Sequence, residues 1–271
     1  MKRSFLKMHG AGNDFVVLDA RQTSPIDSQT AKALADRRLG IGCDQVVVLE
    51  PSQKADVFMR LFNADGSEIG ACGNASRCVG QLLFAETGKA SATIETRAGV
   101  LTAEKAGEGV TVDMGEPKWE WRDIPLAESR NTLHLGLAEG ALMDPVAVNI
   151  GNPHMIFFTR DIGMIDLGKP GPVLEHDPLF PQRANVSVVQ VKTENHLVMK
   201  TWERGAGLTL ACGSAACAAV VAGVRRELCK REARVDVPGG TLQIHWVSGE
   251  GNGRVLMTGP AATVFEGSIE L

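Results

Sequence analysis

Short apolar runs rich in β-branched residues recur along the chain between glycine-containing turns, a pattern typical of strands. In the first half they read "FVVLDA", "QVVVLE" and "VFMRLF", and in the second half "MIFFTR", "VSVVQV" and "LVMKTWE". Two longer stretches, "TRAGVLTAEKAGEGVTVDMGEP" and "VPGGTLQIHWVSGEGNGRVLMTGPA", predict hairpins with glycine-rich turns. The pattern therefore predicts strands in both halves and a hairpin that closes each half.

Two segments predict helices instead. Residues 28–38, "SQTAKALADRR", predict a helix with Ser28 as its candidate N-cap. The segment "GSAACAAVVAGVRREL", which begins at Gly213, is apolar on all sides for about its first three turns. A helix without a polar face is a buried one, so we expect other elements to surround it.

Polar and thiol positions repeat at one offset between the two halves. The stretches "FNADGSEIGACGNASRC" and "WERGAGLTLACGSAAC" share the pattern A-C-G-[N/S]-A, and other polar residues match at the same offset of 139 or 140 positions. The matched pairs are Asn13 with Asn152, Gln45 with Asn185, Asn63 with Glu203, and Cys72 with Cys212. We interpret the chain as two copies of one α/β unit, residues 1–116 and 117–261, with residues 262–271 returning to the first unit.

The overall composition excludes several classes of protein. The chain has 271 residues, 44% of them apolar, and a formal net charge of −4, whereas a phosphate-binding surface usually leaves a basic excess. No apolar run approaches the ~20 residues that span a bilayer, and the start of the chain lacks the apolar core of a secretory signal. We therefore expect a cytoplasmic protein that binds neither nucleic acid nor membrane.

Six cysteines occur in the chain, and in the cytoplasm they are expected to be thiols rather than disulfides. No C-x2-C pair exists, and the close pairs lie six and five residues apart. On a helix these spacings turn the two sulfurs away from each other by about 240° and 140°, so we expect no metal site. The four cysteines outside the matched pair are expected to be small buried packing residues, namely Cys43, Cys78, Cys217 and Cys229.

Cys72 and Cys212 each stand where a strand ends and a helix opens, before Gly73-Asn74 and Gly213-Ser214. The first N–H groups of a helix have no intrahelical partner and carry partial positive charge. We therefore expect this position to lower the pKa of each thiol and to bind a carboxylate alongside it.

Two such cysteines facing one cleft would suit stereoinversion at a carbon next to a carboxylate. One thiolate removes the proton from one face of the carbon, and one thiol returns a proton to the other face. The alternative for each cysteine is a buried hydrophobic role, which the duplicated context makes the weaker interpretation.

The remaining polar residues also have two interpretations. Glu203 and Arg204 could form a solvated surface pair, but the match of Glu203 to Asn63 favours a role in lining the cleft. His154, after "GNP", is either a turn or core histidine or a group that orients the reacting centre. The asparagines and Gln45 are individually ordinary turn residues, and as a matched set they would bind a polar substrate.

The runs "KMHGAGNDFVVLD", "FNADGSEIGACGNASRC", "GNPH" and "WERGAGLTLACGSAACAA" resemble the diaminopimelate epimerase family over nearly the full chain. The resemblance implies an epimerase that needs no pyridoxal phosphate or other cofactor and interconverts LL- and meso-diaminopimelate on the route to lysine and peptidoglycan. It also implies two pseudo-symmetric α/β domains, each a curved, mostly antiparallel sheet around a central helix, with the active site in the interdomain cleft, and a homodimer.

The resemblance further assigns roles to residues. It implies that Cys72 and Cys212 are the acid–base thiols, that His154 and Glu203 contact the reacting amino group, and that Arg204 binds the distal carboxylate. The substrate-binding set that it implies is Asn13, Gln45, Asn63, Gly73, Asn74, Asn152, Asn185, Glu203, Arg204, Gly213 and Ser214. Leu208 departs from the usual family pattern, in which an acid is frequent, and this affects the expected fine substrate preference.

Two alternatives remain. Another cofactor-independent racemase or epimerase of the same fold could act on proline, hydroxyproline or histidine, although these substrates lack the distal carboxylate that Arg204 would bind. A thiol-redox protein or a non-catalytic amino-acid-binding protein could keep the same cleft without turnover.

Overall fold

The computed structural model describes residues 2–271 and divides into two compact units. One unit comprises the chain up to Val112 together with Gly259–Leu271, and the other comprises Asp113–Thr258. Within residues 2–271, no helix has the length and apolar character needed to cross a membrane.

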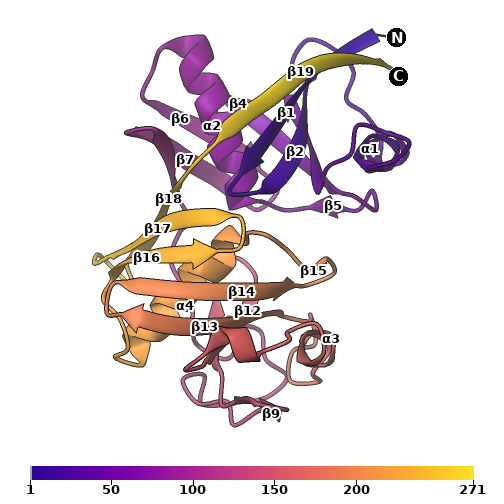
Figure 1. Ribbon diagram of the computed structural model, residues 1–271. Helices are drawn as coiled ribbons and strands as arrows, with labels where there is room; N and C mark the ends of the chain where they lie inside the picture. Colours follow the sequence, from indigo (N-terminus) through magenta and orange to yellow (C-terminus); the bar gives the residue numbers. More distant parts are fainter. Residues whose placement is uncertain (1) are drawn as a thin grey trace. The chain divides into compact units, whose positions relative to one another are not determined.

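The first unit is built on a mostly antiparallel sheet (Figure 1). Its strand order is β19-β1-β2-β3-β4-β6-β7-β8, with the short β5 also beside β4. Only β2–β3 and β4–β6 are parallel pairs. The strands are β1 (Lys2–Gly10), β2 (Asn13–Asp19), β3 (Gln45–Glu50), β4 (Val57–Asn63), β5 (Glu68–Ile69), β6 (Ser91–Thr96), β7 (Gly99–Ala106), β8 (Gly109–Asp113) and β19 (Ala262–Glu270).

Two helices pack on this sheet: α1 (Ser28–Ala35) and α2 (Gly73–Thr87). Helix α1 buries Ala31 and Leu34 against Val46 and Val48 of β3. Helix α2 packs against β1, β6 and β7. Val46, Val47, Val48 and Leu49 of β3 are all buried, so both faces of this strand are covered and its sequence reads as a continuous apolar run rather than an alternating one.

Helix α1 differs from its prediction at both ends. Its N-cap is Asp27, not Ser28, because the Asp27 carboxylate accepts a hydrogen bond from the Thr30 N–H at 2.8 Å. The helix ends at Ala35 rather than at residue 38. Asp36 leaves the helical conformation, and its Oδ1 accepts the N–H of Arg38 and of Leu39 at 2.7 and 2.8 Å, forming a turn that competes with the helix.

The second unit repeats this architecture. Its strand order is β11-β12-β13-β14-β16-β17-β18, with the short β15 also beside β14, and only β12–β13 and β14–β16 are parallel. The strands are β11 (Val146–Asn149), β12 (Pro153–Phe158), β13 (Asn185–Thr193), β14 (His196–Glu203), β15 (Gly207–Leu208), β16 (Glu232–Val237), β17 (Gly240–Val247) and β18 (Arg254–Gly259). A separate pair, β9 (Ala138–Glu139) and β10 (Leu142–Met143), lies before them in the chain.

The helices of the second unit are η1 (Ile162–Met164), α3 (Pro170–Glu175) and α4 (Gly213–Arg225). Every residue from Ala215 to Gly223 in α4 is buried, and the helix packs against six strands, β11, β12, β13, β14, β16 and β17. The predicted buried helix is confirmed. The shared order of strands, short strands and central helix likewise confirms the predicted internal duplication.

Candidate functional site

The four matched positions of the repeat occupy equivalent places in the two units. Asn13 begins β2 and Asn152 directly precedes β12, while Gln45 and Asn185 begin the parallel partners β3 and β13. Asn63 and Glu203 end the next strands, which run antiparallel, so they return to the same edge of the sheet. Cys72 and Cys212 are the N-caps of α2 and α4. The topology therefore gathers each polar set at one sheet edge beside the start of a helix.

In the first unit, the amide of Asn13 links this edge to the cysteine. Its Oδ1 accepts from the Sγ of Cys72 at 3.8 Å and from the Nδ2 of Asn74 at 3.1 Å. Its own Nδ2 donates to Oδ2 of Asp44 at 2.9 Å. Because a carboxylate can only accept, Asp44 fixes the amide so that its oxygen faces the thiol.

Asp44 belongs to a cluster of charges beneath Asn13. Arg37 donates to Oδ1 of Asp14 at 2.6 Å and to Oδ1 of Asp44 at 2.9 Å, and the mostly buried Lys7 donates to Oδ2 of Asp14 at 2.5 Å. Burial alone would raise the pKa of Asp14, but the hydrogen bonds from Arg37 and Lys7 outweigh it and hold that pKa well below its usual range. This network was missing from our sequence prediction. Its only signal was the position of Asp14 and Asp44 next to matched residues.

The side chain of Gln45 lies opposite Asn63 on the neighbouring strand, and its Nε2 donates to Oδ1 of Asn63 at 3.2 Å. Its other amide atom, Oε1, is buried and has no hydrogen-bond partner. A buried acceptor without a partner is costly, so this atom is suited to receive a donor from a bound molecule.

In the second unit, His154 is fully buried at the start of β12. Its Nε2 lies 2.7 Å from Oδ1 of Asn152, an acceptor, so Nε2 carries the hydrogen and Nδ1 is left as a second acceptor. Burial, aided by the charge of Arg204, lowers the pKa of His154 to about 3, and the ring is neutral. Nδ1 is buried without a partner, as is Oε1 of Gln45.

Arg204 follows β14 and is held by its backbone and its side chain. Its N–H donates to Oδ1 of Asn185 at 3.0 Å, and Nδ2 of that asparagine donates to the carbonyl of Pro153 at 3.1 Å. Its guanidinium donates to the carbonyl of Gln182 at 2.9 Å. Burial, together with the charge of Arg183, lowers the pKa of Arg204 from its usual value.

Cys212 is buried, with 6% of its surface exposed, and its Sγ lies 3.6 Å from Oγ of Ser214. Our prediction of a lowered pKa is wrong for this thiol. Burial, followed by the charge of the Glu203 carboxylate, raises the pKa of Cys212 well above 9.0, and the hydrogen bonds from Ser214 and the Ala215 N–H offset only part of this. Cys212 therefore keeps its proton at neutral pH.

Glu203 is itself fixed by Thr209, whose hydroxyl donates to Oε1 of the carboxylate. Thr209 lies on the segment that leads from β14 to α4, so this bond ties the end of the strand to the approach of Cys212. Leu208, the residue that departs from the family pattern, lies on the same segment and is 55% exposed. The hydrogen bond between Thr209 and Glu203 is present beside it.

The other four cysteines match their predicted packing role. Cys43, Cys78 and Cys217 are buried and Cys229 is partly buried, with all six cysteines present as thiols. Burial raises the pKa of Cys43 to about 11, of Cys78 to about 12 and of Cys229 to about 11. Within residues 2–271, no group of three His, Cys, Asp or Glu side chains could hold a metal ion.

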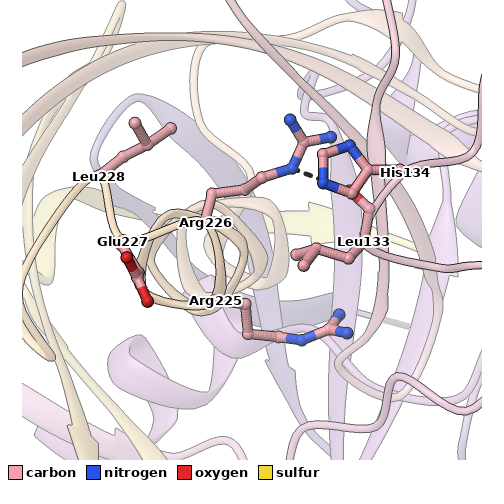
Figure 2. A pocket seen from close by; sticks show the side chains of 6 residues that line it. All are labelled: Leu133, His134, Arg225, Arg226, Glu227 and Leu228. Atoms are coloured by element: carbon pink, nitrogen blue, oxygen red, sulfur yellow. Dashed lines mark hydrogen bonds between the residues drawn. The ribbon is translucent and has the colours of Figure 1, made fainter.

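A pocket of about 430 Å³ lies at the C-terminal end of α4, lined by Leu133, His134, Arg225, Arg226, Glu227 and Leu228 (Figure 2). Arg226 donates to the carbonyls of Leu133 and Asp144 at 2.8 and 2.9 Å, and the Arg225 guanidinium lies 5.0 Å from the ring centre of Trp119. These arginines anchor the helix end to the segment that leads from β8 to β11. The opposite end of α4, about 18 Å away along the helix axis, carries Cys212.

Comparison with known proteins gives consistent results. The family described as diaminopimelate epimerase matches residues 5–120 and 146–264. The diaminopimelate epimerase of Rhodospirillum centenum is 52% identical over 273 residues, covering 99% of this chain and 93% of that protein. That of Acidiphilium cryptum is 53% identical over 271 residues, covering 99% and 96%. A hydroxyproline epimerase structure from Agrobacterium vitis matches with a TM-score of 0.73 at 16% identity, covering 100% of this chain and 93% of that one, which is a likeness of fold.

Proposed function

We propose that the chain, which belongs to the diaminopimelate epimerase family, uses Cys72 and Cys212 as its two proton-transfer groups. The chain is an isomerase of lysine biosynthesis that interconverts LL- and meso-2,6-diaminopimelate. The observation that carries the proposed mechanism is the duplication itself, which supplies one cysteine at the N-terminus of the central helix of each unit.

The proposed reaction inverts one α-carbon without a change of oxidation state. One cysteine thiolate takes the proton as the Cα–H bond breaks, and the second cysteine thiol gives its proton to the opposite face as the new Cα–H bond forms. Between the two transfers, negative charge develops on the α-carboxylate. The first N–H groups of α2, at Gly73-Asn74, and of α4, at Gly213-Ser214, are suited to stabilise that charge.

We assign the acid role in the resting protein to Cys212. Its raised pKa and the nearby Glu203 carboxylate favour the protonated thiol. Cys72 is only partly buried and is the more accessible of the two, so we assign it the base role once it has released its proton to solvent. Reaction in the reverse direction exchanges the two roles.

The polar set is suited to a substrate with two amino-acid ends. Diaminopimelate carries two ammonium groups, and both units contain a buried acceptor that can receive one, Oε1 of Gln45 in the first and Nδ1 of His154 in the second. We assign Nδ1 of His154, together with Glu203, to the reacting ammonium, and Arg204 to the distal carboxylate. Asn13, Asn63, Asn74, Asn152 and Asn185 complete the proposed binding set.

An epimerase for proline, hydroxyproline or histidine would share this fold, as the hydroxyproline epimerase does. Those substrates have no distal carboxylate that could pair with a cationic side chain. The half-buried Arg204 therefore favours a substrate that carries a distal carboxylate. We further propose that the protein works in the cytoplasm and that it is a homodimer. Light scattering of the purified protein tests the dimer through its molar mass in solution.

Deuterium exchange tests the proposed mechanism. When LL-diaminopimelate is incubated with reduced protein in D2O, one α-carbon is expected to gain deuterium and to invert. Proton NMR measures this exchange as loss of the α-proton signal. Cys72→Ala and Cys212→Ala are each expected to abolish inversion. Cys217→Ala, at a buried cysteine inside α4, is the matched control and is expected to retain it. Loss of activity in folded Cys217→Ala with retention in Cys212→Ala would reverse the assignment.

A further inference from the structure

The mechanism proposed above leaves one buried carboxylate unused. Glu175 ends α3 and is 3% exposed. Its Oε2 accepts from the indole Nε1 of Trp202 at 2.7 Å, and its Oε1 accepts from the N–H of Gly205 at 2.9 Å and from the guanidinium of Arg183 at 3.1 Å. Three donors thus converge on a single carboxylate.

Two of these donors flank the dipeptide Glu203-Arg204. Trp202 directly precedes it and Gly205 directly follows it, so Glu175 holds the chain on both sides of these residues. The N–H of Arg204 is bound to Asn185 in addition. Together with the bond from Thr209 to Glu203, all four consecutive residues from Trp202 to Gly205 are held by hydrogen bonds.

The turn needs such an anchor because of its composition. Gly205 and Gly207 have φ values of +76° and +82°, a conformation that glycine enters freely and also leaves freely. The same region is packed closely against α3, because a Cβ added to Gly171 would lie 2.7 Å from Cγ of Trp202. Helix α3 and the turn are thus in direct contact, with the Glu175 carboxylate at that contact.

If packing were the only requirement, a buried carboxylate would be an unfavourable choice for holding a loop, because its charge must be desolvated. Removing a charge from water is unfavourable, and a well-packed apolar side chain in its place is often neutral or stabilising. The partly exposed Arg183 is its only cationic hydrogen-bond donor among the contacts above. This cost is understandable if the carboxylate is retained for the geometry that it imposes on Glu203 and Arg204.

We propose that Glu175 is a positioning residue, which holds the Trp202–Gly205 segment so that Arg204 reaches the distal carboxylate of the substrate and Glu203 stays beside Cys212. The proposal rests on the proposed function, since it assigns substrate contact to Arg204. Glu175 itself does not touch the substrate, and its effect passes through the two residues that it holds.

Calorimetric titration with diaminopimelate tests the proposal, because affinity can be measured whether or not the variant turns the substrate over. Glu175→Ala is expected to weaken binding at least tenfold, and Glu175→Gln, which keeps one acceptor oxygen, to weaken it about threefold. Arg183→Ala is the matched control. It removes the third donor but leaves both bonds to the turn, so binding is expected to change by less than twofold.

A double-mutant comparison separates positioning from a general loss of structure. In an Arg204→Ala background, Glu175→Ala is expected to weaken binding by a clearly smaller factor than in the unaltered protein, because one of the two residues through which it acts has gone. Equal losses in both backgrounds, or unchanged affinity in folded Glu175→Ala, would overturn the proposal. If Glu175→Ala does not fold, the same comparison is made with Glu175→Gln, and unchanged affinity there overturns it.

Deuterium exchange by the unaltered protein keeps the two proposals distinguishable. Absence of exchange with reduced wild-type protein contradicts the proposed function. The affinity series then still decides whether Glu175 acts through Arg204.

Discussion

The buried thiols should make the folded protein sensitive to alkaline pH. Cys43 and Cys78 are 1% and 0% exposed, and burial raises their pKa from 9.0 to about 11 and about 12. A group whose pKa is raised in the folded state holds its proton longer there than in the unfolded chain. The stability that it contributes is fully present below pH 9 and is lost as the pH rises through the folded pKa.

The size of this effect follows from the two pKa values. At pH 10 an unfolded thiol of pKa 9.0 is ionised in a ratio of roughly ten to one, whereas both folded thiols remain mostly protonated. Linkage then lowers the free energy of unfolding by about 1.4 kcal/mol for each thiol, or about 3 kcal/mol for the pair. At pH 7.5 the same expression gives a negligible change.

Urea denaturation at pH 7.5 and at pH 10 measures this difference. The Cys43→Ala/Cys78→Ala variant loses packing at both pH values. Its free energy of unfolding is nevertheless expected to fall by about 3 kcal/mol less between pH 7.5 and pH 10 than that of the unaltered protein. The chain has no tyrosine, so the thiols are the main alkaline groups besides the lysines, which both proteins share.

The control variant is Val79→Ala, a fully buried neighbour of Cys78 with no titratable group. It is expected to lower stability by the same amount at both pH values. An equal alkaline loss in the unaltered protein and in the double cysteine variant would refute the reasoning, because it would mean that the folded thiols ionise as readily as the unfolded ones.

Two further predictions concern local structure in the first unit. Asp27→Ala is expected to lower the urea midpoint, because it removes the acceptor for the Thr30 N–H, and Asp27→Asn is expected to retain most of the stability. Gly80→Ala is expected to cost about 1–3 kcal/mol, since its Cβ would lie 2.7 Å from the Cβ of Ala103. Urea denaturation checks both, and an unchanged midpoint in either alanine variant would show that the contact concerned does not limit stability.

The sequence predicted the duplicated fold because its signals are local. The apolar runs mark the strands, the alanine-rich segment after Cys212 marks a helix with no polar face, and the offset of 140 residues pairs it with the segment after Cys72. Each of these patterns depends on residues that are close in the chain or related by one constant shift. Tertiary contacts were not needed to read them.

What the sequence could not predict depends on burial and on contacts between residues that are not neighbours in the chain. The pKa of Cys212 rises because the helix start is buried and because Glu203, nine residues earlier, comes beside the sulfur. The sequence argument considered only the N–H groups at the helix start, which lower the pKa of the thiol by less than burial and Glu203 raise it. Asp44 and Glu175 were missed for a similar reason, since their hydrogen bonds reach 31 and up to 30 residues along the chain.

The pairing of β1 with β19 has a consequence for synthesis on the ribosome. Lys2 lies opposite Glu270 and His9 opposite Ala262, so β1 is completed only by a strand that is made much later (Figure 1). At 5–20 residues per second, roughly ten seconds or more separate the two. The continuous segment Asp113–Thr258 is synthesised in the meantime. One edge of β1 is therefore left without its native partner until β19 emerges from the ribosome.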